Sequence, residues 1–509
     1  MNISLIEVPE SKITLNHDGK ELVLSGVRTN YPKQSPLIVA GILRNHADVK
    51  IIDMKIMYPT REELYKEFQY DKGIIRCYML GASFDSINNE IEKSDIIGIT
   101  SNFTRSSQIV MEFINHAKKI NPGVKVIVGG SDATARPEHY LINGTDFVIL
   151  GEGECSGPKL IEALKNNRLI EEITGIAYKT KNIITLNRRP LSDHFNIDHV
   201  PFPAFDLIKG YLSEYNEAFE GKLPQGVNPP IGIIETSRGC TNICDFCATP
   251  NLRGGYRFMT TRRLEELLDH YKKNGINTLV IMEDNILARL TKSRGRTSLI
   301  EMFTLLKEKG FAWEFGNGIE FCKLKKEGKI DEELISLLFR PGSLQNGKIS
   351  GCYRALIPLE TLQNHPEQAY AKLRPLNEEM QIIRSIIGTG LKRITFGIVI
   401  GRYNGNPNDL HIIEKEAESI IKICEDAKVQ SYFALYIYVP TPGSSGYNQM
   451  KDFCLYSIVE YPELYQFWTS PFKTNAYSPK ELTLAKLKLE QKINGVKIDR
   501  LLYYGKYDN

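Results

Sequence analysis

Buried-strand patterns that alternate with helical patterns are the feature that most constrains this chain. In its first half, residues 49–53, 95–101, 125–130 and 146–151 form short, mostly apolar runs, and helical periodicity extends from about residue 108 to residue 120. Continuous apolar strands separated by helices are typical of a parallel sheet that is covered on both faces. We therefore predict an α/β fold that begins with a doubly wound, Rossmann-like domain.

Polar and glycine residues follow these predicted strands at their carboxyl ends. In a doubly wound sheet, ligands bind beyond the carboxyl ends of the strands. The candidate ligand-binding residues are Ser101, Asn102, Thr104, Gly129, Gly130, Ser131, Gly151 and Glu152. The pattern alone does not identify the ligand of this domain.

A second series of strand patterns begins at residue 231 and continues at residues 278–282, 312–317, 354–359, 393–400 and 432–439. About six strands with intervening helices predict a partial (β/α)6 TIM-type barrel, whose site lies at the carboxyl ends of the strands. The predicted domains are residues 1–195, a proline-rich linker at 196–230, the barrel at 231–445 and a small, mainly helical C-terminal cap at 446–509.

Three clustered cysteines follow the first strand of the second series. Cys240, Cys244 and Cys247 have the spacing C-x3-C-x2-C. Thiolates at this spacing can hold three irons of a 4Fe–4S cluster, which usually takes four cysteines, so one iron stays open to a small molecule. The alternative is a zinc knuckle, which needs a second cysteine pair. No C-x2-C pair follows in the chain.

This cysteine pattern resembles the defining motif of the radical S-adenosylmethionine (SAM) enzymes, in which SAM binds the open iron. The resemblance extends to acidic residues after the second and fourth barrel strands and to glycines of the fifth strand. It implies that SAM contacts Phe246, Glu283, Asp284, Glu360, Thr361, Gly397 and Gly401.

The first domain resembles the cobalamin-binding domain that precedes the barrel in many radical SAM enzymes. The similarity lies in residues 128–134 and 150–154, and more loosely in residues 35–41, while residues 201–205 resemble the connection between the two domains. It implies that the polar and glycine residues named above bind cobalamin. The D-x-H-x-x-G motif of other cobalamin enzymes is absent. Cobalamin is therefore expected base-off, without a histidine on cobalt.

The resemblance implies an enzyme with a 4Fe–4S cluster, SAM and cobalamin, in which the cofactors supply the difficult chemistry. The expected function is C-methylation: a 5′-deoxyadenosyl radical takes hydrogen from an unactivated carbon, and methylcobalamin supplies the methyl group. No residue is assigned a catalytic role. Three alternatives stay open: a cyclase or rearrangement enzyme with the same cofactors, a cobalamin-free radical SAM enzyme with a vestigial first domain, and a non-catalytic cofactor-binding sensor.

Composition excludes several kinds of partner. The chain has 64 basic and 61 acidic residues and a net charge of +3, so nucleic acid is not expected as a partner. No apolar run approaches the ~20 residues that span a bilayer, and the N-terminus does not resemble a signal peptide. Nine cysteines, three of them clustered, suit a reducing cytoplasm. The expected partners are a small-molecule or peptide substrate and a reductase or flavodoxin that donates electrons.

Overall fold

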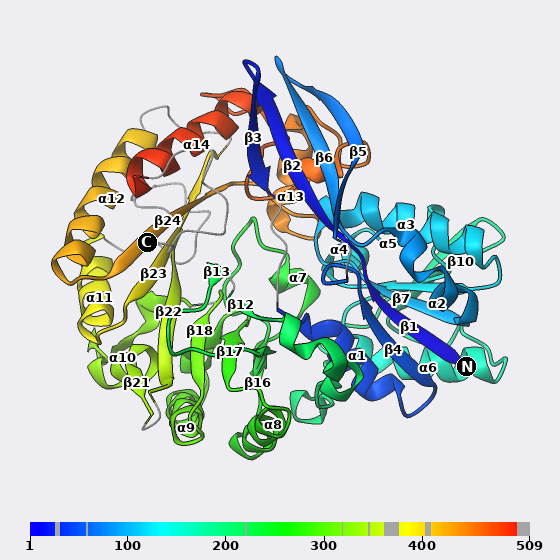
Figure 1. The fold of residues 1–509 in the computed structure, drawn as a ribbon, viewed down its shortest axis with the longest axis horizontal. Coiled ribbons are helices and arrows are strands. Elements are labelled where there is room, and N and C mark those ends of the chain that lie inside the picture. The colour runs from blue at the N-terminus through cyan, green and yellow to red at the C-terminus, as the bar shows by residue number, and fades with distance from the viewer. Residues whose placement is uncertain are drawn as a thin grey trace.

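The computed structural model describes residues 1–25, 31–57, 60–218, 221–317, 319–344, 347–360, 376–402 and 409–495. A mainly parallel sheet forms the N-terminal domain, a second parallel sheet curves into a partial barrel, and a small antiparallel sheet stands between them at the top of Figure 1.

The N-terminal sheet has the strand order β11-β10-β9-β8-β7-β1-β4. Its parallel strands are β1 (Asn2–Glu7), β4 (Asp48–Asp53), β7 (Ile96–Thr100), β8 (Lys125–Gly129) and β9 (Phe147–Ile149), and β10 (Ile176–Thr180) and β11 (Ile183–Asn187) extend it in antiparallel fashion. Helices α1 (Gln34–Leu43) and α6 (Gly153–Lys165) pack on one face, and α2 (Asn88–Lys93) and α3 (Ser107–Ile120) on the other. The predicted doubly wound domain is confirmed.

Short elements complete this domain and the barrel loops. They are η1 (Phe84–Ile87), η2 (Thr104–Ser106), α4 (Ser131–Ala135), α5 (Pro137–Ile142), η5 (Ile286–Thr291), η6 (Phe321–Lys323), β19 (Lys325–Lys326) and β20 (Lys329–Ile330).

The antiparallel sheet is a feature that sequence analysis missed. Its strands are β2 (Glu10–His17), β3 (Lys20–Ser25), β5 (Arg61–Tyr70) and β6 (Gly73–Gly81), in the order β3-β2-β6-β5. Because β2 follows β1 and β5 follows β4, the sheet extends from the carboxyl edge of the N-terminal sheet. It packs on the C-terminal region, where Ile13 and Leu15 share a core with Leu464 and Leu487.

The second parallel sheet has the order β14-β17-β18-β22-β23-β24. Its strands are β14 (Ile231–Ile234), β17 (Thr278–Ile281), β18 (Ala312–Phe315), β22 (Ile349–Glu360), β23 (Arg393–Ile400) and β24 (Gln430–Ile437), and β21 (Pro341–Ser343) pairs antiparallel with β22. Helices α8 (Thr261–Lys273), α9 (Gly295–Glu308), α10 (Glu332–Phe339), α11 (Leu376–Gly388) and α12 (Asp409–Asp426) surround it (Figure 1). This arrangement confirms the partial (β/α)6 barrel.

The connection between the two domains is packed rather than loose. It contains η3 (Ile197–His199), η4 (Phe205–Glu214) and the strands β12 (Glu217–Ala218) and β13 (Gly221–Lys222). Phe205 lies in one continuous core with Leu37 of α1 and Leu267 of α8, and its ring centroid is 5.1 Å from that of Tyr271. The two domains therefore share a core, and the domain limits stay predictions.

The C-terminal region contains α13 (Ser445–Met450), η7 (Lys451–Phe453), η8 (Pro462–Leu464) and α14 (Pro479–Asn494). Helix α14 packs on the edge strand β24, where the backbone N–H of Leu435 donates to Glu490 Oε1 at 2.7 Å. Of the helices within the described residues, none combines the length and apolarity that a membrane crossing requires.

Candidate active site

The three predicted cluster ligands lie on one loop beyond the carboxyl end of β14. The loop connects β15 (Ser237–Arg238) to α7 (Thr249–Leu252) and carries Cys240, Cys244 and Cys247. Cys244 is buried and the other two are half-buried. Among the described residues, no three His, Cys, Asp or Glu side chains converge enough to hold a single metal ion. Thiolates of a cluster bind separate irons, so the donor set on this loop fits a cluster.

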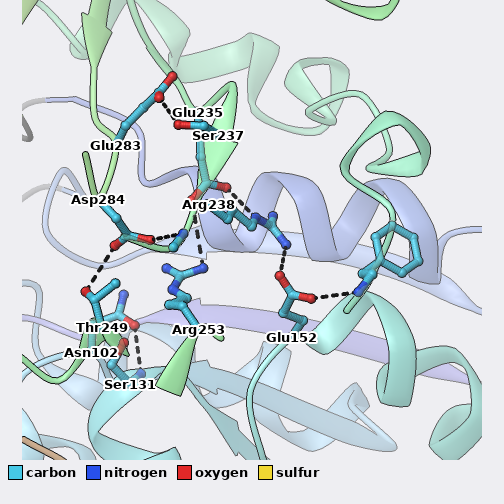
Figure 2. Close-up of polar contacts among 12 residues, drawn as sticks. Asn102, Ser131, Glu152, Glu235, Ser237, Arg238, Thr249, Arg253, Glu283 and Asp284 are labelled. Atoms are coloured by element: carbon cyan, nitrogen blue, oxygen red, sulfur yellow. Dashed lines mark hydrogen bonds and ion pairs between the residues drawn. The ribbon is translucent and has the colours of Figure 1, made fainter. Parts of the chain in front are cut away.

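Asp284, a predicted SAM contact, holds both ends of this loop. Its Oδ2 accepts a hydrogen bond from the backbone N–H of Gly239 at 2.8 Å, and its Oδ1 accepts one from Thr249 Oγ1 at 3.3 Å (Figure 2). Gly239 directly precedes Cys240, and Thr249 lies two positions after Cys247. The carboxylate therefore fixes where the cysteine loop begins and ends.

Glu283, the neighbouring predicted SAM contact, points into the protein. Only 2% of it is exposed, and Oε1 accepts from the backbone N–H of Thr236 at 2.9 Å while Oε2 accepts from Ser237 Oγ. Burial raises the pKa of this carboxyl above its usual value, although Arg289 opposes that shift. Both oxygens thus brace the segment that leads to the cysteine loop.

Of the other predicted SAM contacts, Glu360 and Gly401 lie at the carboxyl ends of later barrel strands and Gly397 lies within one. Glu360 is the last residue of β22 and is buried, Gly397 lies within β23 and Gly401 directly follows it. A Cβ on Gly397 would be 3.1 Å from the ring of Tyr436. Thr361 lies outside the described residues. Parallel strands thus bring Glu360 and Gly401 to the edge that carries the cysteine loop.

Sequence analysis missed Asp245, which lies on the cysteine loop, and its two partners Arg402 and Tyr438, which follow the last two barrel strands. Asp245 accepts hydrogen bonds from Arg402 Nη2 at 3.0 Å and from the Tyr438 hydroxyl at 2.9 Å. The rings of Phe246, a predicted SAM contact, and Tyr438 lie edge to face, 6.3 Å apart. The position of Arg402, directly after Gly401 at a strand end, was the available signal in the sequence.

Asn285 is a further contact of the cysteine loop that was missed. Its Nδ2 donates to Cys240 Sγ at 3.5 Å and to Glu320 Oε2 at 2.7 Å. The side chain is 2% exposed. An N–H group directed at a ligand sulfur is one of the means by which proteins tune a cluster's reduction potential.

The predicted cobalamin residues surround the carboxyl edge of the N-terminal sheet. Gly130 has φ +105°, and a Cβ there would lie 2.5 Å from the carbonyl oxygen of Ser101. The backbone N–H of Ser131 donates to Asn102 Oδ1 at 3.1 Å (Figure 2). The loops after β7 and β8 are therefore in direct contact, and only glycine allows that approach.

The hydroxyls of Ser101 and Thr104 face a buried network. Thr104 Oγ1 donates to Asp132 Oδ1 at 2.5 Å, and Ser101 Oγ lies 2.7 Å from the Tyr140 hydroxyl. Asp132 also accepts from the Tyr140 hydroxyl at 2.6 Å. These side chains order the loops, which leaves the backbone and Asn102 at the surface of this edge.

Gly151 and Glu152, after β9, have different surroundings. Gly151 has φ +83°, and no atom lies within 4 Å of the place a Cβ would take, so the loop offers open space to a ligand. Both oxygens of Glu152 are engaged: Oε1 accepts from Arg238 Nη1 at 2.9 Å and from Arg257, and Oε2 accepts from the backbone N–H of Phe195 at 3.0 Å. Glu152 thus faces the barrel.

Two family models match the chain. The B12 binding domain matches residues 22–160 and the Radical SAM superfamily matches residues 234–412. The chain is 27% identical over 345 residues to the cytidylyl-2-hydroxyethylphosphonate methyltransferase of Streptomyces wedmorensis. That match covers 62% of this chain and 60% of the relative, less than two thirds of its length.

Two solved structures share the fold. OxsB, a cobalamin-dependent SAM radical enzyme with aqua-cobalamin and SAM bound, has a TM-score of 0.68 at 15% identity, over 97% of this chain and 67% of OxsB. TsrM of Kitasatospora setae, a radical SAM methyltransferase with cobalamin and a [4Fe-4S] cluster bound, has a TM-score of 0.61 at 14% identity, over 96% of this chain and 84% of TsrM. At these identities the likeness concerns the fold.

A B12-binding domain joined to a radical SAM barrel defines a class of proteins with two cofactor sites. The chain carries both domains in that order, and by these two matches it belongs to the cobalamin-dependent radical SAM enzymes, as the sequence predicted. The family implies a 4Fe–4S cluster, SAM and cobalamin. The residues present fit these groups, because three cysteines share the loop between β15 and α7 and the strand-end loop at Gly151 is open.

Proposed function

We propose that this enzyme is a C-methyltransferase that acts on an unactivated carbon of a small molecule or peptide. One observation carries the proposal: the cobalamin-binding edge touches the cysteine loop segment, through Glu152 of one domain and Arg238 of the other, at 2.9 Å. When bound, the cofactors supply a radical that removes hydrogen and a methyl group that replaces it. Adjacent cofactor sites suit a reaction that uses both on one carbon.

The chain's own residues position the cofactors and substrate in this proposal. Hydrogen abstraction by a radical requires no general base, so carboxylates near the site can serve as anchors. Asp284 keeps the cysteine loop in place, and Asp245 holds it against Arg402 and Tyr438. Orientation of this kind accounts for a large part of catalysis when the reactive groups belong to cofactors.

We further propose that cobalamin is bound base-off with no histidine on cobalt. The D-x-H-x-x-G motif that supplies the axial histidine in other cobalamin enzymes is absent, and none of the nine histidines of the chain fits it. Electron paramagnetic resonance of the cob(II)alamin form tests this, because a coordinated imidazole nitrogen would split the cobalt lines further.

We infer that the enzyme works in a reducing cytoplasm with a reductase or flavodoxin as electron donor. Its nine cysteines, all within the described part of the chain, form no disulfides. Such usage is typical of a reducing compartment.

The experiment that tests the function is anaerobic reconstitution with iron, sulfide and hydroxocobalamin. About four irons and one corrinoid per chain are expected, and methyl-labelled SAM is then used to screen acceptors. Cys244→Ala should abolish 5′-deoxyadenosine formation, whereas the control Cys155→Ala, outside the loop, should not. Iron without bound corrinoid would contradict the proposal and favour a cobalamin-free radical SAM enzyme.

A further inference from the structure

A buried arginine joins the two cofactor edges. Arg238 lies in β15, two positions before Cys240, and its side chain is 6% exposed. Nη1 donates to Glu152 at 2.9 Å and Nε to Glu235 at 2.8 Å (Figure 2). Nη2 donates to Glu154 at 2.7 Å. Two of these carboxylates follow β9 of the cobalamin-binding domain, and the third follows β14 of the barrel.

The surrounding charges are balanced. Arg257, which pairs with Arg238 across β15 and β16 (Arg257–Phe258), also donates to Glu152. Arg253 lies 3.8 Å from Glu235. Three guanidinium groups thus face three carboxylates. Burial alone would raise the pKa of Glu154, but Arg238 lowers it below its usual value, so the carboxylate stays charged.

The domains are also joined by an apolar core that does not include this network. Phe205 and Ile208 of the connection already pack between α1 and α8 in one shared core. Buried ion pairs contribute little net stability, because desolvation offsets their attraction. A guanidinium whose three nitrogens all donate hydrogen bonds fixes the positions of its partners, because its planar fork accommodates only a narrow range of carboxylate positions.

Arg238 and its carboxylate partners lie next to both predicted cofactor-binding loops. Glu152 directly follows Gly151, and the Gly151 backbone borders the open space at the cobalamin edge. Arg238 directly precedes Gly239, whose backbone N–H donates to Asp284 at the start of the cysteine loop. A shift of the guanidinium would move one cofactor loop relative to the other. Misplacement by about 1 Å can cost a reaction two orders of magnitude.

We propose that Arg238 is a positioning residue that keeps the cysteine loop in register with the cobalamin-binding edge, so that the cluster and cobalt keep one fixed separation. This rests on the proposed function only in assuming that both cofactors bind. The chemistry itself belongs to the cofactors, and Arg238 touches neither the substrate nor the reacting atoms in this role.

The test is the separation between cob(II)alamin and the reduced cluster, measured by pulsed electron paramagnetic resonance in the enzyme loaded with hydroxocobalamin, iron and sulfide and then reduced with dithionite. Arg238→Lys keeps the charge but loses the fork, and Glu154→Gln removes one arm of the contact. Each should shift or broaden the separation by about 1 Å or more. The control Arg262→Lys removes a surface arginine that is 90% exposed and pairs with Glu266, and it should leave the separation unchanged.

Two further readouts separate positioning from folding. Iron and corrinoid content should match the wild type in both variants, and 5′-deoxyadenosine formation from SAM with dithionite should stay within about threefold, because the cysteine loop keeps its Asp284 anchors. The double variant should be no worse than Arg238→Lys alone, since the arm that Glu154→Gln removes belongs to the fork that Arg238→Lys already loses.

An unchanged separation in Arg238→Lys and Glu154→Gln would overturn the proposal. Loss of iron in both variants would also overturn it, because Arg238 would then serve the folding of the loop. Absence of any methylated product from the wild type would contradict the proposed function alone, since the separation between cofactors is measured without an acceptor.

Discussion

Replacement of Gly130 by alanine is the sharpest test of the cobalamin edge. Gly130 has φ +105° and ψ 175°, a region that is essentially restricted to glycine and costs other residues about 1–3 kcal/mol. The added methyl would also lie 2.5 Å from the Ser101 carbonyl oxygen and 2.7 Å from its carbon. Both atoms belong to the backbone and cannot rotate away, so overpacking adds about 1–3 kcal/mol.

The expected loss in the free energy of unfolding is therefore about 4 kcal/mol. Gly151→Ala is the matched control on the same edge, because φ is +83° and no atom lies within 4 Å of the new Cβ. Only the left-handed backbone penalty remains there, about 1–2 kcal/mol. The methyl group that Gly151→Ala adds would instead occupy the open space that we assign to cobalamin.

The assay is urea unfolding followed by circular dichroism, combined with a titration of hydroxocobalamin by absorbance. With a slope of about 3 kcal/mol per molar urea, Gly130→Ala should lower the midpoint by about 1.3 M and Gly151→Ala by about 0.5 M. Gly151→Ala should nevertheless weaken cobalamin binding. Equal midpoints for the two variants would refute the clash argument, and unaltered binding by Gly151→Ala would refute the placement of cobalamin over this loop.

Three other predictions follow from single contacts. Asn285→Leu removes the N–H group directed at Cys240 Sγ and should make the cluster potential more negative by on the order of 50 mV in a redox titration; an unchanged potential would show that this contact does not tune it. Tyr70→Phe removes hydrogen bonds to the Ser470 carbonyl and to Thr483, and thermal unfolding should show a loss of about 1–2 kcal/mol, whereas no loss would mean that the antiparallel sheet does not depend on this contact. Burial raises the pKa of Glu416 to about 7 from 4.5, so the folded state keeps a proton that the unfolded chain releases, and stability falls as pH rises from about 4.5 to 7. Glu416→Gln should therefore raise Tm by about 2 °C at pH 8 and leave it unchanged at pH 4; an equal rise at both pH values would contradict this.

Strands with apolar runs could be predicted from sequence, and charged ones could not. β7 and β8 are covered on both faces, so their side chains form continuous apolar runs. β5 has the sequence REELYKEFQY and is mostly exposed, and its partner β6 also pairs with β2, more than 50 residues away. A half-exposed strand with many charges has no buried pattern to detect, and distant pairing has no local signal.

The site could be predicted where backbone topology alone brings residues together. Parallel strands place Asp284, Glu360 and Gly401 at one edge with the cysteine loop, whatever their side chains contact. The contacts themselves could not be predicted. Glu152 stays a predicted cobalamin contact from its place after a strand. Its hydrogen bonds with Arg238 and Phe195 had no signal in the sequence, because these pairings exist only after two domains have packed.

The carboxylates of both edges act mainly on the chain itself. Asp284 holds the cysteine loop, Asp132 holds the loops after β7 and β8, and Glu152 holds the two domains in register. An enzyme that generated its own acid or base would keep such groups directed at the substrate. Here the reactive groups come from cofactors, and the remaining task of the protein is to fix the separation of the cofactors and to exclude competing reactions. Conservative substitutions that keep charge but alter hydrogen-bond direction should therefore be more damaging at these positions than their small effects on stability would suggest.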